Sequence, residues 1–303
     1  TCQALPCKDG SLTLQLRLPD ALQQGKYLLI KNIRFAYGHL NILNALNSCQ
    51  KRHDLKHKKD SSYIYWGQAI SYRFKQGENL KWYIYVTVTV PEPPSCTHSE
   101  RGSIGLDINA DHIALAETDT QGNIIHTLSF PLNTYGKTTH QACALIGDVA
   151  AKIVSYAQIA CKPITLENLD FTQKKQELRT RCNARFSRML SSFSYSKIIT
   201  AVKSRSYRFG VETRLVDPAF TSTIGRIKYA VRFGLTIHQS AAFCIARRGM
   251  GVSEKVPSRW DRIPDGKGGY IALTPPVRTR AKHKWSLWRT VHRKLSAELA
   301  AHF

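Results

Sequence analysis

The sequence SIGLDINADHIALAETDTQGNIIHTLSF, residues 103 to 130, holds three short apolar runs separated by polar turns. The runs are rich in Ile, Leu and Ala, and the second turn is the Gly-containing TQGN. Apolar runs of this length, bounded by Asn, Asp and Gly, predict three strands that pair in antiparallel order. This stretch decides the fold, because everything after it must pack on the sheet that it begins.

The residues that follow predict alternating helices and strands. A long Ala-rich helix is expected from about 137 to 160, then a strand at PITLEN, a basic helical stretch over 172 to 208, a strand at VETRLVD and a helix beginning near His238. Three antiparallel strands followed by helix, strand, helices, strand and helix predict an α/β domain with one mixed sheet. This is the order of an RNase H-like fold.

The segments on either side have different patterns. Residues 1 to 95 read mostly as antiparallel strands, at 12–19, 27–38, 69–74 and 81–91, with one helix over about 39–52 that ends in the basic run KRHDLKHKKD. That run is either a solvated loop or a patch that contacts a nucleic-acid backbone. The Pro-rich segment PEPPSCTHSERG predicts a linker, so we expect domains over 1–98 and 99–251, followed by a basic tail over 252–303 with an amphipathic helix at 281–301.

Composition narrows the class of protein. The chain has 303 residues and 44 Lys and Arg against 21 Asp and Glu, a formal net charge of +23. Such an excess predicts a polyanionic partner, although charge alone does not separate nucleic acid from an anionic membrane surface. No apolar run was expected to reach the length of a membrane span. The eight cysteines form no CxxC pair, which is typical of reduced thiols in a cytosol.

Two carboxylates interrupt runs that otherwise favour burial. Asp107 lies inside SIGLDINA, and Glu167 is the last residue but one of PITLEN. A buried carboxylate is costly unless it is paired, hydrogen-bonded or bound to a metal, and the alternative for Asp107 is a turn-capping role before Asn109. If the two strands are neighbours, both carboxylates emerge at one edge, where Mg²⁺ or Mn²⁺ would relieve their repulsion and support phosphodiester hydrolysis.

Five blocks occur in an order that is specific for one family: GLDIN at 105–109, ITLENLDF at 164–171, RMLSSFSYSKI at 188–198, GVETRLVDPAFTS at 210–222 and GLTIHQSAAFCIARRG at 234–249. Together they resemble the RuvC-like nuclease domain of TnpB, also called OrfB, the insertion-sequence proteins related to type V CRISPR effectors. The resemblance implies a β-rich wedge domain before the nuclease domain and RNA-guided DNA endonuclease activity in a prokaryotic cytosol, near the nucleoid. It implies guide RNA and target DNA as partners, and Asp107 and Glu167 as the first two catalytic acids.

The chain departs from this family at the third acid. The family carries an Asp two residues before Asn-Ala-Ala, and the matching position here is His238 in HQSAA. His238 either replaces that Asp as a metal ligand or general base, or marks a protein that binds RNA and DNA without cutting, or is a helix N-terminal histidine bonded to backbone. A basic nucleic-acid chaperone that uses no guide is a further alternative.

A second departure concerns zinc. The family usually carries a cysteine-rich zinc ribbon after the Thr-Ser pair, but Thr221 and Ser222 run into TIGRIKYAVRFGLT, which has no cysteine. We therefore expect no zinc. The ribbon is expected to be replaced by a short basic segment whose cations contact nucleic acid: Arg226, Lys228 and Arg232.

Other candidates complete the predicted site. Asp217, at the end of VETRLVD, is a secondary candidate for the metal edge, although an Asp before Pro commonly initiates a turn. The basic helix after Glu167 either forms a solvated face or holds the phosphates of a guide–target duplex. Its cations are Lys174, Lys175, Arg179, Arg181, Arg185 and Arg188.

Overall fold

The protein, seen here as a computed structural model, consists of two compact units, Thr1–Pro91 and Glu92–Phe303. The structure describes residues 2–22, 25–53, 62–66, 68–169, 192–255, 257, 260–277 and 283–301. We call the two parts the first unit and the second unit. The contacts divide the chain between Pro91 and Glu92, so residues 92–98, which the sequence assigns to the first domain, belong to the second unit.

The second unit is built on one five-stranded mixed sheet in the order β10-β9-β8-β11-β12. The pairs β10 with β9 and β9 with β8 are antiparallel, whereas β8 with β11 and β11 with β12 are parallel. This order confirms the predicted mixed sheet and gives the second unit an RNase H-like fold. The strands are β8 (Ile104–Ile108), β9 (His112–Thr118), β10 (Ile124–Pro131), β11 (Ile164–Glu167) and β12 (Thr213–Val216).

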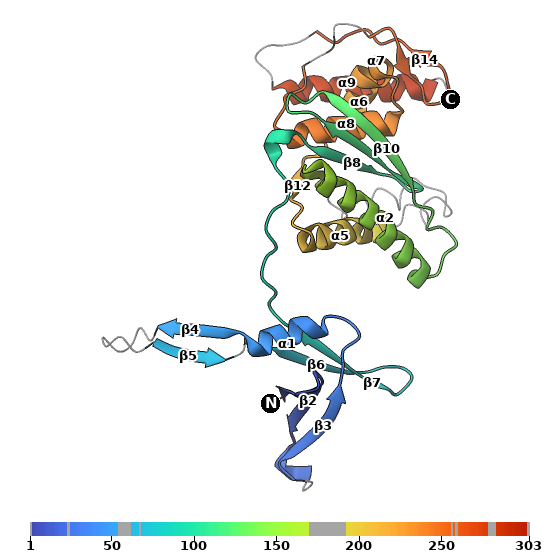
Figure 1. The fold of residues 1–303 in the computed structure, drawn as a ribbon. Coiled ribbons are helices and arrows are strands. Elements are labelled where there is room, and N and C mark those ends of the chain that lie inside the picture. The colour runs from blue at the N-terminus through green and yellow to red at the C-terminus, as the bar shows by residue number, and fades with distance from the viewer. Residues whose placement is uncertain are drawn as a thin grey trace. The chain divides into compact units, whose positions relative to one another are not determined.

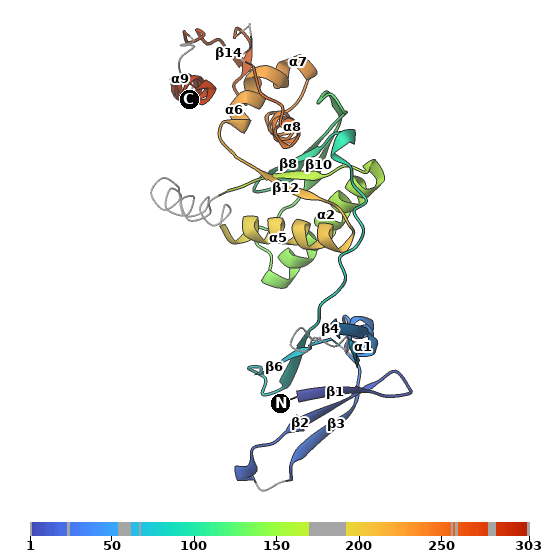
Figure 2. The ribbon, with the colours of Figure 1, turned by 90° about the vertical axis from the view of Figure 1, so that its left-hand side faces the viewer.

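Helices cover both faces of this sheet, as Figures 1 and 2 show. On one face α2 (Thr139–Ala160) and α5 (Ser192–Arg208) pack on the side chains of Ile104, Leu106 and Leu166. On the other face lie α6 (Thr221–Gly225) and α8 (Ile237–Gly249), which pack on each other, while α8 also lies against β8 and β9. Alternate residues of one strand face opposite sides of a sheet, so Gly105 and Asp107 face α8.

Helix α8 lies close to the sheet because small residues line the contact. A Cβ atom at Gly105 would lie 2.1 Å from the carbonyl oxygen of Ala242 and 2.4 Å from the amide nitrogen of Ala246. Only glycine leaves room for this approach. The contact sets the distance of the first turn of α8, with His238, from the end of β8.

Helix α2 is capped at both ends and carries the core of its face. Thr138 and Gln141 form a capping box, and Cys161 ends the helix with a left-handed backbone. By length and composition this helix could cross a membrane, which corrects the expectation that no apolar run is long enough. Its inward residues belong to the core cluster of the sheet: Ile146, Val149, Ala150, Ile153, Val154 and Ala157.

The C-terminal residues pack on the same unit through an amphipathic helix. The helix α9 (Lys284–Ala301) buries Trp288, Val291 and Leu295, three residues of the predicted apolar stripe, against a second core cluster that includes Phe243 of α8. Between α8 and α9 lie the short strands β13 (Ile263–Pro264) and β14 (Tyr270–Ile271). The basic segment after Thr221 is helical as well, with a π-helical turn η3 (Arg226–Ala230) and then α7 (Val231–Phe233).

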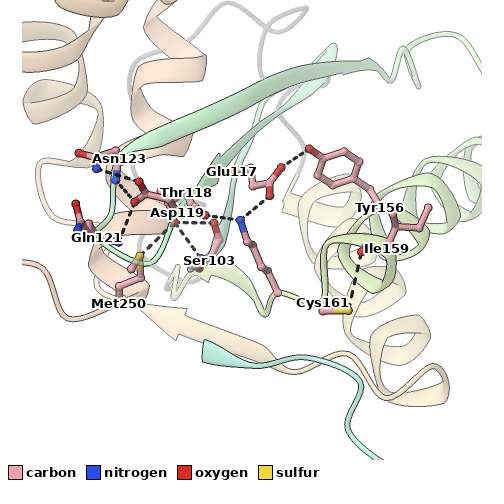
Figure 3. Close-up of polar contacts among 11 residues, drawn as sticks. Ser103, Glu117, Thr118, Asp119, Gln121, Asn123, Tyr156, Ile159, Cys161 and Met250 are labelled. Atoms are coloured by element: carbon pink, nitrogen blue, oxygen red, sulfur yellow. Dashed lines mark hydrogen bonds and ion pairs between the residues drawn. The ribbon is translucent and has the colours of Figure 1, made fainter. Parts of the chain in front are cut away.

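A buried ion pair lies in the second unit, outside the predicted site (Figure 3). Lys162 Nζ donates to Glu117 Oε1 over 2.6 Å and to the carbonyl oxygen of Thr118 over 2.6 Å. The hydroxyl of Tyr156 donates to the other oxygen of Glu117. Because Lys162 precedes β11 and Tyr156 belongs to α2, this network ties strand β9 to the end of α2.

The first unit is rich in β-structure, as the sequence predicts. Its described residues form the sheet β1-β2-β3, one α-helix, and the antiparallel pairs β4 with β5 and β6 with β7. The helix was expected to run to about residue 52 but ends at Asn47, and residues 49–53 form a strand whose sequence, CQKRH, has no apolar pattern that would reveal it. The elements are β1 (Cys2–Pro6), β2 (Leu12–Arg17), η1 (Asp20–Leu22), β3 (Tyr27–Ile33), α1 (His39–Asn47), β4 (Cys49–His53), β5 (Ser62–Trp66), β6 (Ser71–Gln76) and β7 (Trp82–Thr87).

Candidate active site

Asp107 and Glu167 lie on neighbouring parallel strands. The register pairs Ile104 with Ile164 and Gly105 with Thr165, so each carboxylate comes two residues after the last paired position of its strand. The carboxyl ends of parallel strands meet at one edge of the sheet, and residues in register project to the same face. The expectation that both carboxylates emerge together therefore agrees with the sheet.

The loop after β12 also reaches this edge. Thr221, at the start of α6, is buried and donates its hydroxyl hydrogen to Glu167 Oε1. The same hydroxyl lies 3.1 Å from the carbonyl oxygen of Pro218. The bond from Thr221 orients the Glu167 carboxylate, so the Thr-Ser pair of the sequence motif has a structural partner in the second acid.

His238 lies in the first turn of α8 and contacts Asp107 directly. Its Nδ1 atom is 3.0 Å from Asp107 Oδ2, and the same oxygen accepts from Asn109 Nδ2 over 2.9 Å. A carboxylate only accepts hydrogen bonds, so His238 Nδ1 carries the hydrogen. The neutral ring then keeps its lone pair on Nε2, and the side chain is 47% exposed. The hydrogen-bond partner of His238 is therefore a carboxylate, so the alternative of a histidine bonded to the backbone is wrong.

A second histidine, His112, joins the cluster. Its ring meets the ring of His238 edge to face, with centroids 4.9 Å apart. His112 Nδ1 lies 2.6 Å from Asp111 Oδ1, and its Nε2 lies 3.5 Å from Asn109 Nδ2. Each histidine thus has its Nδ1 directed at a carboxylate, and Asn109 contacts both pairs.

The electrostatics of the cluster follow from these contacts. The hydrogen bond to Asp107 raises the pKa of His238 above its ordinary value, and partial burial opposes this shift. The pKa of Tyr195, on α5, is raised by burial first and then by the charges of both Glu167 and Asp107. The charges of both carboxylates therefore act on one phenol.

The described residues at this edge include two carboxylates that could hold a hard cation, but no third ligand grouped with them. Among the described residues no three His, Cys, Asp or Glu side chains are grouped so that they could hold a metal ion. Mg²⁺ is commonly bound by one or two carboxylates, with water and substrate phosphates completing the octahedron. Asp107 and Glu167 supply such a pair, and Asp107 Oδ1 accepts no hydrogen bond within the part of the chain that the structure describes. His238 Nδ1, in contrast, is engaged by Asp107.

Of the remaining predicted residues, only some lie near the cluster of Asp107 and His238. Asp217 Oδ1 accepts a hydrogen bond from the amide of Ala219 over 2.8 Å, which is the turn expected of an Asp before Pro. In the register of β11 and β12, Val216 and not Asp217 lies beside Glu167. The charge of Arg226 acts on His238, and the pKa of Arg226 is itself lowered by burial. Arg226 therefore lies near the cluster.

The other two cations of that segment have local partners. Lys228 pairs with the buried carboxylate of Glu254, which also accepts from Tyr229 and Arg247. Arg232 lies over the ring of Phe233, 5.2 Å from its centroid. The cations predicted after Glu167 lie outside the described residues: Lys174, Lys175, Arg179, Arg181, Arg185 and Arg188.

Sequence reasoning missed several members of the cluster. Asn109 was considered only as a turn neighbour of Asp107, and His112, Asp111 and Tyr195 were not considered. The pattern DINADH places two carboxylates, an amide and an imidazole within six residues of a strand end, and this density of polar groups is the signal that was available. Nothing in the sequence marks Tyr195, because its helix joins the site only through the fold.

No family model matches the chain. Two proteins of Aeropyrum pernix, both described only as uncharacterized, are 29% identical over 154 residues, 48% of this chain and 42% or 37% of theirs. The uncharacterized protein SSO2105 of Saccharolobus solfataricus is 23% identical over 208 residues, 66% of this chain and 53% of its own length. The chain thus spans about half or less of the length of these relatives.

Three solved structures show distant likeness. Thermus thermophilus RuvC is 16% identical with a TM-score of 0.35, covering 49% of this chain and 96% of RuvC. The same organism's RuvC in complex with a Holliday junction substrate is 13% identical, with a TM-score of 0.34 over 48% of this chain and 88% of that one. A Cas12f1–sgRNA–target DNA complex is 13% identical, with a TM-score of 0.33 over 66% and 65%. Because these values are low, the fold assignment rests on the sheet order itself.

Proposed function

We propose that this chain is a divalent-metal-dependent nuclease of the RuvC type, which hydrolyses phosphodiester bonds at the edge that carries Asp107 and Glu167. The observation that supports this most is the register of β8 and β11, which brings the two carboxylates to one edge and one face of the sheet. Two carboxylates in one place repel unless a cation lies between them. Mg²⁺ or Mn²⁺, held by these two residues, would neutralise the charge that develops on the phosphate oxygens during hydrolysis.

The protein's own groups supply the rest of the chemistry. His238 Nε2, the ring nitrogen with a free lone pair in the neutral form, takes the proton of the attacking water. Asp107 holds the ring through Nδ1 and stabilises the positive charge that forms on it. Thr221 keeps Glu167 in one orientation through its hydroxyl. Histidine at the third position thus acts as a base, because its Nδ1 is already bonded to Asp107.

We further propose that the enzyme is directed by a guide RNA to a target DNA in a prokaryotic cytosol. The support is the ordered resemblance to TnpB proteins and the net charge of +23. The cations predicted to follow Glu167 would hold the duplex through its phosphates, a mode that reads shape and leaves sequence to base pairing. The β-rich first unit would serve as the wedge domain of this assembly.

A second candidate function is RNA-guided DNA binding without cleavage. The observation in its favour is that His238 stands at the third acid position, and that no three metal-ligating side chains are grouped among the residues that the structure describes. Loss of one charged oxygen ligand weakens a Mg²⁺ site. This alternative predicts target binding that needs the guide and yields no cut strand.

Cleavage of a guide-matched plasmid by the copurified protein–RNA complex, in Mg²⁺ or Mn²⁺, separates the two functions. The proposal predicts that wild type cuts, that Asp107→Ala and His238→Ala do not, and that all three bind the target. A plasmid lacking the matched sequence is the control for guidance. If only His238→Asp cuts, or if no form cuts while all bind, the natural protein is a binder.

A further inference from the structure

The hairpin of β6 and β7 in the first unit presents two unlike faces. Its register pairs Arg73 with Tyr85 and Lys75 with Tyr83, and the intervening pairs are Tyr72 with Val86 and Phe74 with Ile84. Successive side chains of a strand point to opposite sides. Arg73, Lys75, Tyr83 and Tyr85 therefore share one face, which we call the Tyr–cation face.

The opposite face is the one that packs within the first unit. Tyr72 lines a cavity together with Ala4 of β1 and Leu46 of α1. Burial there raises the pKa of Tyr72. The side chains of Ile84 and Val86 are partly buried on the same side, whereas Phe74 and Trp82, nearer the turn, are exposed there. The Tyr–cation face consequently points away from the core of its own unit.

The Tyr–cation face holds large aromatic surfaces in solvent. Tyr83 is 43% exposed and Tyr85 is 53% exposed, and Arg73 and Lys75 are exposed beside them. Exposed aromatic residues on a soluble surface commonly mark a contact for a partner. Strands SYRFKQ and WYIYVT contain no Asp or Glu, so the charge of the two strands is wholly positive.

One ring of this face is held in place. Asn79 Nδ2 donates to the hydroxyl of Tyr83 over 3.1 Å. A Cβ atom at Gly77 would lie 2.8 Å from Cε2 of the Tyr83 ring, so the ring lies directly over this glycine in the turn. A ring fixed before binding loses little freedom when a partner stacks on it.

We propose that the Tyr–cation face binds unpaired nucleotides of a single-stranded nucleic acid. Tyr83 and Tyr85 lie two residues apart on one strand, about 7 Å along it, and offer stacking surfaces to two successive bases. Arg73 and Lys75, directly across the ribbon, lie within reach of the phosphates of the same nucleotides. Every base has a π-face, so this contact tolerates any sequence. The inference extends beyond the proposed nuclease activity, because no residue of the second unit takes part.

The test measures binding and needs no cleavage. The 303-residue chain carrying Asp107→Ala, stripped of copurified nucleic acid in high salt, is titrated into a fluorescent oligopyrimidine RNA, the DNA of the same sequence, and a blunt duplex. Tyr83→Ala with Tyr85→Ala should raise the Kd for single strands about tenfold or more and leave the salt dependence unchanged, because no charge is lost. Arg73→Gln with Lys75→Gln should weaken binding and reduce the salt dependence as well.

Conservative and distant variants control for folding. Tyr83→Phe with Tyr85→Phe keeps the rings and should bind single strands as wild type does. Tyr37→Ala removes a 93% exposed tyrosine elsewhere in the first unit and should have no effect. Greater loss on RNA than on DNA would identify RNA as the ligand, and equal loss would assign both. The inference is overturned if the double alanine variant binds like wild type, if the phenylalanine pair loses as much, or if duplex binding falls equally.

Discussion

Asp107 and Glu117 lie on adjacent strands of one sheet, and each residue is 9% exposed. The two carboxylates differ in their hydrogen-bond partners. Glu117 accepts from the ammonium of Lys162 and from the phenol of Tyr156, so a full positive charge and a second donor satisfy it. Asp107 accepts from a ring nitrogen of His238 and an amide of Asn109. A buried carboxylate that is paired with a lysine stabilises the fold. A buried carboxylate without such a charged partner can still bind a metal cation.

The largest effect is expected from removing the charge of Asp107. Asp107→Asn should lower cleavage by roughly 10³-fold or more, because the candidate metal loses a charged ligand. It should leave thermal stability unchanged or higher, because a buried charge without a cation is removed. Plasmid cleavage and a thermal melt check this pair of results. If Asp107→Asn lowered the melting temperature while the folded protein still cut, Asp107 would be the structural carboxylate of the two.

Removing the cation from the other carboxylate should give the opposite result. Lys162→Met leaves Glu117 charged and buried, and should destabilise the second unit by about 3–5 kcal/mol. Cleavage per folded molecule should be unchanged. Denaturant unfolding measures the loss. The double variant Glu117→Gln with Lys162→Met should recover much of it, and failure to recover would show that Lys162 acts through packing alone.

A third buried carboxylate, Glu254, allows the contribution of a paired carboxylate to stability to be measured as a function of pH. Although burial opposes the shift, hydrogen bonds from Lys228, Tyr229 and Arg247 hold the pKa of Glu254 below its ordinary value. A lowered folded-state pKa stabilises the protein above the unfolded pKa, and this stabilisation disappears as pH falls through the folded pKa. Glu254→Gln should therefore be less stable than wild type at pH 7, by about 2 kcal/mol.

The two proteins should converge in stability only as the pH falls through the lowered pKa of Glu254, where wild type also carries a neutral side chain at this position. Melting temperatures of wild type and Glu254→Gln across this range measure the difference. A gap that stays constant from neutral to acid pH would mean that the charge of Glu254 contributes nothing.

The smallest effect is expected from the hydroxyl of Tyr156. Tyr156→Phe removes one hydrogen bond to charged Glu117 and keeps the ring, so it should cost about 1.5 kcal/mol in unfolding free energy. Cleavage should stay at the wild-type rate, since Glu117 belongs to the structural pair. A loss of cleavage as large as that of Asp107→Asn would place both carboxylates in one functional network.

Local patterns predict much of this fold and less of its site. Apolar runs bounded by turns locate β8, β9 and β10, and the polar strand at Cys49–His53 escapes notice because it contains no such run. Asp107 and Glu167 stand out because a carboxylate interrupts an apolar strand. His112 and Tyr195 do not, because only the tertiary fold brings them to the edge. Net charge likewise cannot show that Lys228 pairs with Glu254.

The central claim is that the Asp107 edge, and not the Glu117 network, binds a divalent metal. Titration of Mn²⁺ followed by electron paramagnetic resonance tests it on wild type, Asp107→Asn and Tyr156→Phe, without dependence on guide or substrate. We predict bound Mn²⁺ in wild type and Tyr156→Phe, and its loss in Asp107→Asn. Equal binding by all three proteins, or no binding by wild type, would contradict the account.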